Sequence, residues 1–138
     1  MRFTNKTVFI TGAAGGIGRQ TGLSFAKEGA NVAVSDLDFD MASRVAKEIK
    51  SAGGNAEPFK LDVTNQNETI ENMKNAYEHF GSLDIAFCNA GIREIVSPLE
   101  LSIEEWRKVI DINVTGVFIT AQTFAKHCIE KKIKGNIV

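Results

Sequence analysis

The residues Thr11-Gly12-Ala13-Ala14-Gly15-Gly16-Ile17-Gly18 form a glycine-rich stretch between an apolar run, Thr7-Val8-Phe9-Ile10, and a helical pattern over residues 17–27. In a dinucleotide-binding loop, one glycine allows a tight turn after a strand, a second lets the backbone approach a pyrophosphate, and a third lets the helix pack on the sheet. Gly12, Gly16 and Gly18 stand where these roles are needed. The free amides and the dipole at the start of the helix favour phosphate. The stretch therefore predicts a pyrophosphate-binding loop, with a ligand-free glycine-rich turn as the alternative.

Asp36 supplies the acidic residue that such a fold places after its second strand. It follows Asn31-Val32-Ala33-Val34-Ser35, a predicted strand, and lies 24 positions after Gly12. A carboxylate at this point accepts hydrogen bonds from the ribose hydroxyls of NAD and repels the 2′-phosphate of NADP. Gly15 and Leu37, two positions that could carry a compensating base, are uncharged. We expect NAD rather than NADP, and the alternative for Asp36 is an N-cap role in the following helix.

Strand and helix patterns alternate along the whole chain. Beyond Asp36 the predicted elements are a helix over residues 38–51, a strand over 56–61, a helix that includes 70–80, a strand over 83–88, a helix after Ser102, a long helical stretch over 113–132 and a strand from Gly135. Strands separated by helices need crossover connections, which favours a parallel sheet covered by helices on both faces. We therefore predict one α/β domain over residues 1–138, a doubly wound, Rossmann-type parallel sheet that is truncated after the start of its fifth strand.

Local signals predict details of several elements. Pro58 favours an edge position for its strand, or a place at the strand start, because proline cannot donate to a central ladder. Asn65 with Glu68, and Ser102 with Glu105, match the capping-box spacing at helix starts. Trp106, Val109 and Ile110 are expected to form the buried face of the helix after Ser102. The long helix is expected to be buried on two sides, against its own sheet and against a partner subunit, through Val114, Val117, Phe118, Ala121, Phe124, Ala125 and Cys128.

Composition excludes several classes of protein. Lys and Arg total 16 and Asp and Glu total 17, so there is no basic field to hold a nucleic acid or an anionic membrane. No apolar run approaches the ~18 residues of a membrane span, and the polar N-terminus does not resemble a secretory signal. Cys88 and Cys128 are expected to be reduced thiols, and the isolated His79 and His127 to be surface or helix-end residues, so we expect no metal site. We expect a cytoplasmic protein.

Five segments, in order along the chain, resemble the short-chain dehydrogenase/reductase family. They are the Gly-x-x-x-Gly-x-Gly loop, Asp36 after the second strand, Leu61-Asp62-Val63, Asn89-Ala90-Gly91 and the segment from Ser102 to Phe118. The resemblance implies NAD contacts from Gly12, Ala14, Gly15, Gly16, Ile17, Gly18, Asp36, Leu37, Asp62, Val63, Asn89, Ala90 and Gly91. It also implies that Asn113 is the family's active-site asparagine. The alternatives are a turn-capping role for Asp62, purely backbone hydrogen bonds for Asn89, and a mid-helix Asn113 that bonds its own backbone.

The resemblance also implies a catalytic Ser, Tyr and Lys, and the sequence lacks them. Its single tyrosine, Tyr77, is followed four residues later by Gly81, and no serine occurs after Ser102. We therefore expect the amino-terminal portion of an NAD-dependent oxidoreductase that acts on a small alcohol or carbonyl compound, and we expect the 138-residue chain alone to be inactive. A dimer or tetramer is implied as well. The alternatives are a non-catalytic nucleotide-binding or interaction module and an NADP-linked 3-oxoacyl-carrier-protein reductase.

Overall fold

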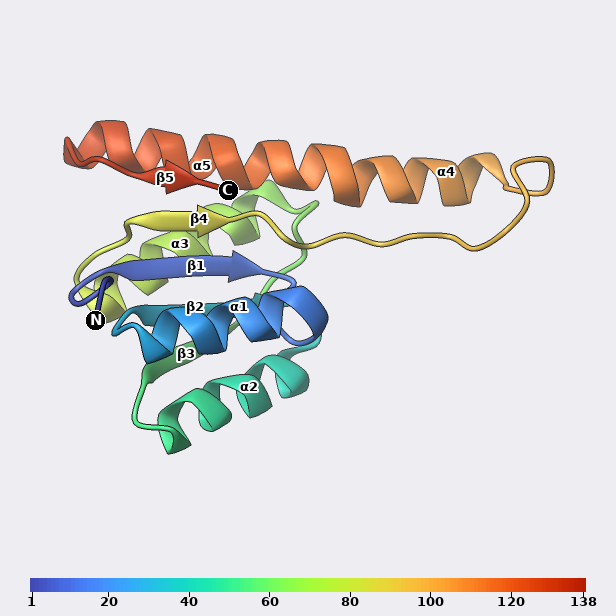
Figure 1. Cartoon of the computed structure of the whole chain (residues 1–138). Helices are drawn as coiled ribbons and strands as arrows, with labels where there is room; N and C mark the ends of the chain where they lie inside the picture. Colours follow the sequence, from blue (N-terminus) through green and yellow to red (C-terminus); the bar gives the residue numbers. More distant parts are fainter.

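The computed structural model describes residues 1–138, and a five-stranded parallel sheet lies at its centre (Figure 1). The sheet order is β3-β2-β1-β4-β5. The strands are β1 (Thr7–Thr11), β2 (Asn31–Asp36), β3 (Asn55–Lys60), β4 (Ile85–Phe87) and β5 (Asn136–Ile137). The helices are α1 (Gly16–Lys27), α2 (Phe39–Ser51), α3 (Gln66–Phe80), α4 (Ile103–Ile110) and α5 (Gly116–Lys131), with a π-helical segment, η1 (Asp111–Thr115), between the last two. The doubly wound α/β prediction is confirmed.

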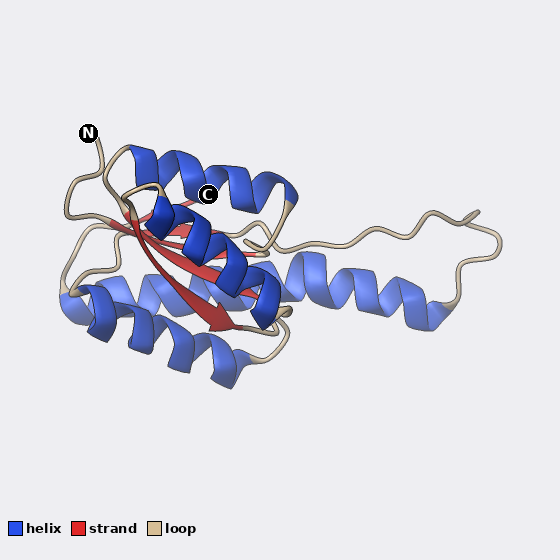
Figure 2. Cartoon of the chain, turned by 90° about the horizontal axis from the view of Figure 1, so that it is seen from below, coloured by secondary structure: helices blue, strands red, loops and turns tan.

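Alternate residues of β1 point to opposite faces of the sheet and so build two hydrophobic cores. Val8 and Ile10 join one core with Val45 and Ile49 of α2. Phe9 joins the other core, which includes residues of α3 and α5 such as Met73 and Phe124. Figure 2 shows helices above and below the strands. Because both faces of β1 are covered, all five of its residues are buried.

Most predicted element bounds match the structure within one or two residues. The predicted strand over 83–88 is shorter, because β4 covers only Ile85–Phe87. Pro58 lies in β3, which is an edge strand because it pairs only with β2, so this prediction is confirmed. The Ser102–Glu105 capping box is also present.

The capping-box prediction for α3 is half right. Asn65 caps the helix by accepting hydrogen bonds from the amides of Asn67 and Glu68. The Glu68 carboxylate does not return a bond to the Asn65 amide, because that amide donates to the Asp62 carbonyl. Glu68 accepts instead from the Asp62 amide and from the Asn65 side chain. The loop before α3 is therefore tied to the helix by Glu68.

The segment α4–η1–α5 forms a nearly straight helical arm that projects beyond the sheet (Figures 1 and 2). α4 has no buried residue, and Trp106 is 52% exposed. On the remainder of the arm, Phe124 and Cys128 are buried against the sheet, whereas Val114 and Phe118 are 57% and 61% exposed. The predicted buried face of α4 is therefore wrong for this chain, since no element covers it. The long helix is buried against its own sheet, and burial of its other side against a partner subunit stays a prediction.

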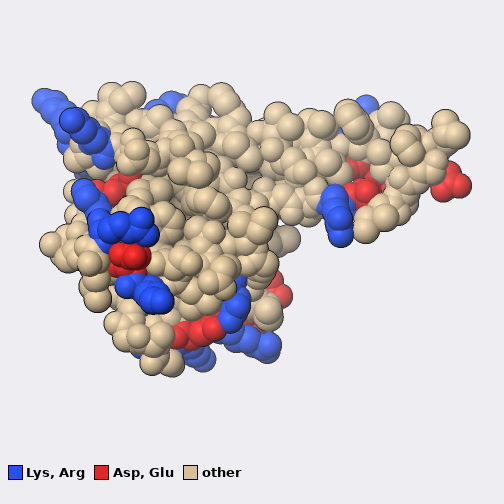
Figure 3. Space-filling view, viewed as in Figure 1, with Lys and Arg blue, Asp and Glu red and all other residues tan.

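Charges of both signs are interspersed over the face of the molecule in Figure 3. The pattern agrees with the near-zero net charge of the sequence. None of the helices combines the length and the apolarity that a membrane-crossing helix needs. No strongly basic field is visible on this face that would attract a polyanion.

Candidate functional site

A groove of 840 Å³ lies where the carboxyl ends of β1, β2, β3 and β4 open onto loops. Parallel sheets of this type bind ligands at this edge, at the point where the strand order reverses. β1 is that point, because β2 lies on one side of it and β4 on the other. All of the predicted cofactor-contacting residues except Ala14 and Gly18 line the groove. Leu61, Ile92, Arg93 and Ile112 also line it, although the sequence analysis did not assign them to the cofactor.

The glycine-rich loop owes its shape to contacts that exclude side chains. Gly12 has a φ of +63°, and a Cβ there would lie 2.8 Å from the Ala90 Cα. A Cβ on Gly18 would overlap the Gly12 carbonyl oxygen and lie 2.6 Å from the Asn89 side-chain nitrogen. Gly18 is therefore a packing residue behind the groove. Gly16 has a φ of +48°, and no atom lies within 4 Å of a Cβ built there, so the backbone is open on this side.

The start of α1 is free for an anion. Its N-cap residue is Gly15, which has no side chain to accept from the first amides of the helix. The first turn also contains no acidic residue. Uncapped amides and the helix dipole together favour a negatively charged group. The sequence-based interpretation of this loop as a phosphate site therefore has a suitable geometry.

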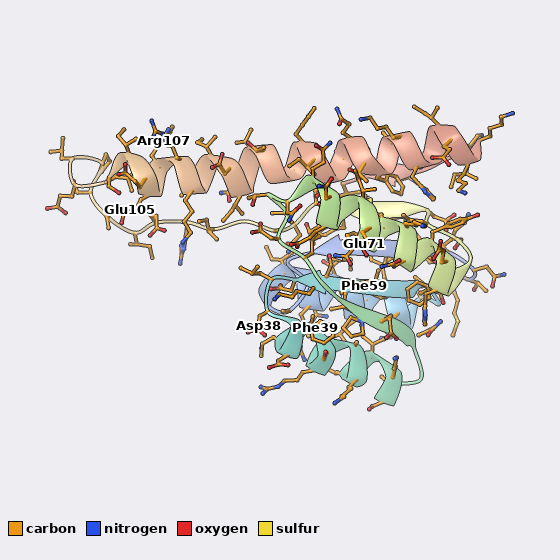
Figure 4. The ribbon with its side chains drawn as sticks, turned by 180° about the vertical axis from the view of Figure 1, so that it is seen from behind. Asp38, Phe39, Phe59, Glu71, Glu105 and Arg107 are labelled. Carbon is orange, nitrogen blue, oxygen red and sulfur yellow. The ribbon has the colours of Figure 1, made fainter.

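The Asp36 carboxylate is held in place by two backbone amides. One oxygen accepts from Ala14 N at 3.0 Å and the other from Asp38 N at 3.0 Å. The N-cap of α2 is Asp38, whose side chain accepts from Met41 N, so the N-cap alternative for Asp36 is wrong. Figure 4 labels Asp38 and Phe39 at the start of α2. Ala14 does not line the groove, and its amide instead orients the carboxylate that does.

Asp62 combines a local turn role with a place on the groove wall. Its Oδ1 accepts from the Thr64 amide at 2.9 Å and from the Thr64 hydroxyl at 2.7 Å. The turn-capping alternative is therefore present in the structure. Val63, the next residue, packs against the start of α5, because a Cβ on Gly116 would lie 2.7 Å from Val63 Cγ2. Contact of either residue with an adenine ring stays a prediction.

Asn89 links the ends of β4 and β1. Its side-chain nitrogen donates to the carbonyl oxygens of Thr11 and Gly12, both at 3.0 Å. The buried Thr11 hydroxyl accepts from the amides of Asn89 and Ala90, also at 3.0 Å each. These four bonds fix the glycine loop from behind, so the expected backbone role of Asn89 is present. This role of Thr11 was not predicted from the sequence, where the only feature that pointed to it was its position at the end of a strand.

Asn113 lies in η1 and bonds the loop that follows β4. Its Oδ1 accepts from Ile92 N at 2.8 Å, and its Nδ2 donates to the Ile92 carbonyl at 2.8 Å. The alternative in which Asn113 bonds its own backbone is therefore wrong. Irregular π-helical turns occur often at functional sites, because they redirect one side chain out of the helical pattern. Here the side chain anchors the groove wall and is not itself part of the lining.

Arg19 does not line the groove. Its guanidinium pairs with the Glu48 carboxylate, with Nε and Oε2 2.9 Å apart, and so joins α1 to α2. Arg93 is the only Lys or Arg that lines the groove, and the sequence analysis did not single it out. A charged residue two positions after Asn89-Ala90-Gly91 was the available signal.

The cysteines and histidines lie outside the groove. Both thiols are free, and burial raises the pKa of Cys88 and of Cys128. His79 is exposed, as expected. His127 is partly exposed near the end of α5, although its Nε2 is buried without a hydrogen-bond partner. Its ring packs edge-on against Tyr77 between α3 and α5. No group of three His, Cys, Asp or Glu side chains is arranged to hold a metal ion.

Comparison with known proteins gives one consistent family. The profile of a family described as "short chain dehydrogenase" matches residues 6–138. Cyclohexanol dehydrogenase of Acinetobacter sp. (strain SE19) is 43% identical over 118 residues, which are 85% of this chain and 47% of that protein. A 3-oxoacyl-[acyl-carrier-protein] reductase of Thermotoga maritima is 34% identical over 138 residues, 100% of this chain and 56% of that protein. A crystal structure of a short-chain type dehydrogenase/reductase from Mycobacterium marinum superposes with a TM-score of 0.94 at 38% identity, covering 98% of this chain and 55% of that one. The chain thus spans about half the length of the curated relatives it matches.

Proposed function

Since this chain belongs to the short-chain dehydrogenase/reductase family, we propose that it is the NAD(H)-binding part of an oxidoreductase. The parent enzyme transfers a hydride between a nicotinamide cofactor and an alcohol or carbonyl compound. The observation that carries the proposal is the single groove lined by the glycine loop, Asp36, Asp62 and residues 89–91. The nicotinamide ring, when bound, supplies the hydride donor or acceptor, and the chain supplies the cradle that orients it.

Different residues of the groove suit different parts of the cofactor. The open backbone at Gly16 and the uncapped amides of α1 suit the pyrophosphate. The oriented carboxylate of Asp36 suits the ribose hydroxyls of the adenosine half. Residues 62–63 lie beyond Asp36 in the sheet order, next to where the adenine would extend, and residues 89–91 lie on the other side of β1, next to the nicotinamide half. This order of residues along the sheet edge supports a dinucleotide that lies across it.

The preference for NAD over NADP rests on Asp36 and the uncharged Gly15 and Leu37 beside the groove. The identity to the Thermotoga maritima reductase supports an oxoacyl reductase as a second candidate, but a carboxylate at Asp36 would repel the 2′-phosphate of NADP.

Calorimetric titration with NADH and NADPH separates the two candidates. We expect Asp36→Ala to weaken NADH binding by about ten- to a hundredfold, because hydrogen bonds to charged groups contribute about 1.5–3 kcal/mol. Asp40→Ala, an exposed position in the first turn of α2, is the matched control. Equal affinity of the unmodified chain for NADH and NADPH would contradict the NAD preference.

We expect the 138-residue polypeptide to bind NADH without turnover. Its single tyrosine, Tyr77, packs against His127 between α3 and α5 and does not line the groove. No phenol is therefore available beside the cofactor to exchange a proton with the substrate oxygen. Oxidation of any alcohol by a chain of verified mass would refute this expectation. A chain that binds neither NADH nor NADPH would favour the non-catalytic interaction module instead.

Four further expectations stay predictions. Asn113 is expected to be the active-site asparagine of the parent enzyme, where its hold on Ile92 would fix the loop beside the nicotinamide. The parent is expected to be a dimer or tetramer in which a second copy covers part of the arm that carries the exposed Val114 and Phe118. Residues 1–138 are expected to be the amino-terminal portion of a single-domain enzyme. A cytoplasmic location is expected as well.

A further inference from the structure

The charged residues of the groove are separated along its length. The lining contains two carboxylates, Asp36 and Asp62, and one cation, Arg93. Asp62 follows β3, Asp36 follows β2, the glycine loop follows β1 and Arg93 follows β4. Because the strands are parallel and their order is β3-β2-β1-β4-β5, these loops follow one another along a single edge of the sheet. Arg93 therefore lies at the end of the groove opposite the two carboxylates.

The backbone that carries Arg93 is anchored. Ile92, the residue before it, exchanges two hydrogen bonds of 2.8 Å with the Asn113 side chain. Gly91 lies beside the same side chain, because a Cβ on Gly91 would be in ordinary contact with Asn113 Oδ1 at 3.4 Å. The start of the Arg93 side chain is thereby fixed on the groove wall. Such anchoring lowers the entropy that is lost when a side chain meets a ligand.

The Arg93 guanidinium is uncommitted within the chain. Arg2 pairs with Glu28 and Arg19 pairs with Glu48, but Arg93 takes part in no ion pair or hydrogen bond. The two groove carboxylates, by contrast, already accept hydrogen bonds from the chain. A planar guanidinium offers several N–H donors in a geometry that matches a carboxylate in a bidentate pair. The groove thus presents one free cationic side chain, at one end.

We infer that Arg93 binds a carboxylate of the substrate, so that the parent enzyme acts on an alcohol or carbonyl compound that also carries a carboxylate. This inference rests on the proposed function. The cofactor pyrophosphate is the other possible anion, but the uncapped start of α1 that suits it follows β1, in the middle of the groove. Arg93 lies past that point, on the side of β4 where the nicotinamide half and the substrate would meet.

The test uses the 138-residue chain with NADH bound. Levulinate, a ketone with a carboxylate, and levulinamide, its neutral amide, are titrated calorimetrically into that complex. We expect levulinate to bind more tightly than levulinamide. Arg93→Gln should remove this preference and weaken levulinate binding by about tenfold, because an exposed charge-assisted pair has part of its strength screened by water. Arg107→Gln removes the same charge from α4, labelled in Figure 4, and should change neither affinity.

The separate NADH titration distinguishes the two proposals. If the unmodified chain fails to bind NADH, the proposed function is refuted. If NADH binds but levulinate and levulinamide bind equally, or neither binds, the inference about Arg93 is overturned while the proposed function stands. The same conclusion follows if Arg93→Gln weakens NADH itself by tenfold, since the guanidinium would then serve the pyrophosphate.

Discussion

The Thr11 hydroxyl gives the sharpest test of how the glycine loop is supported. Thr11 is 1% exposed, and its oxygen accepts hydrogen bonds from the amides of Asn89 and Ala90. Thr11→Val keeps the shape and the strand preference of the side chain but removes both acceptor interactions. A buried donor left without a partner costs about 1–3 kcal/mol. Asn89 N keeps a second acceptor, the Phe87 carbonyl at 3.1 Å, whereas the Ala90 amide is left without a partner. One partly buried amide therefore predicts a loss of about 1–3 kcal/mol in the free energy of unfolding.

The assay is urea unfolding followed by circular dichroism, with Thr120→Val as the matched control. Thr120 is also 1% exposed, but its hydroxyl donates to the Gly116 carbonyl within its own helix. Thr120→Val leaves no amide without an acceptor, because the Gly116 carbonyl keeps its backbone partner in the helix. The free energy of unfolding is therefore expected to change by no more than about 0.5 kcal/mol. Hydrogen exchange at Ala90 should accelerate only in Thr11→Val, and NADH affinity should fall with it. Equal losses in the two variants would refute the argument that Thr11 supports the loop.

The remaining predictions concern packing at the loop and the partly buried imidazole of His127. Gly18→Ala should lower the free energy of unfolding by about 1–3 kcal/mol in urea, because the added Cβ would meet the Gly12 carbonyl and the Asn89 side chain. Gly15→Ala is the control, because no atom lies within 4 Å of a Cβ built there, and it should change the free energy of unfolding by less than about 0.5 kcal/mol. Burial, and secondarily the charge of Lys131, lower the pKa of His127 in the folded state, whereas its unfolded-state pKa is about 6.5. Protonation therefore favours the unfolded chain, and this effect grows as pH falls below about 6.5. His127→Gln should lose less stability than the unmodified chain between pH 7.5 and about pH 5 in urea titrations, and parallel losses would contradict the prediction.

Local patterns were sufficient to predict the fold. Val8, Phe9 and Ile10 form an unbroken apolar run because β1 is covered on both faces, and such a run between turn signals is typical of a buried parallel strand. The role of Gly12 could also be predicted, because few residues other than glycine adopt its positive φ and its close approach to the neighbouring strand. An apolar run and a glycine at a turn each depend on a few neighbouring residues, so they can be recognised in the sequence alone.

The partners of the site side chains depend on contacts between distant segments. Thr11 meets Asn89 across 78 positions, Arg19 meets Glu48 across 29, and Asn113 meets Ile92 across 21. Composition and spacing could suggest that these residues matter, but not which atoms they bond. The exposure of Trp106 was mispredicted for the same reason, since an apolar helical face is buried only where another element covers it. Periodicity shows which face of a helix is apolar, whereas the packing of the whole chain decides what that face meets.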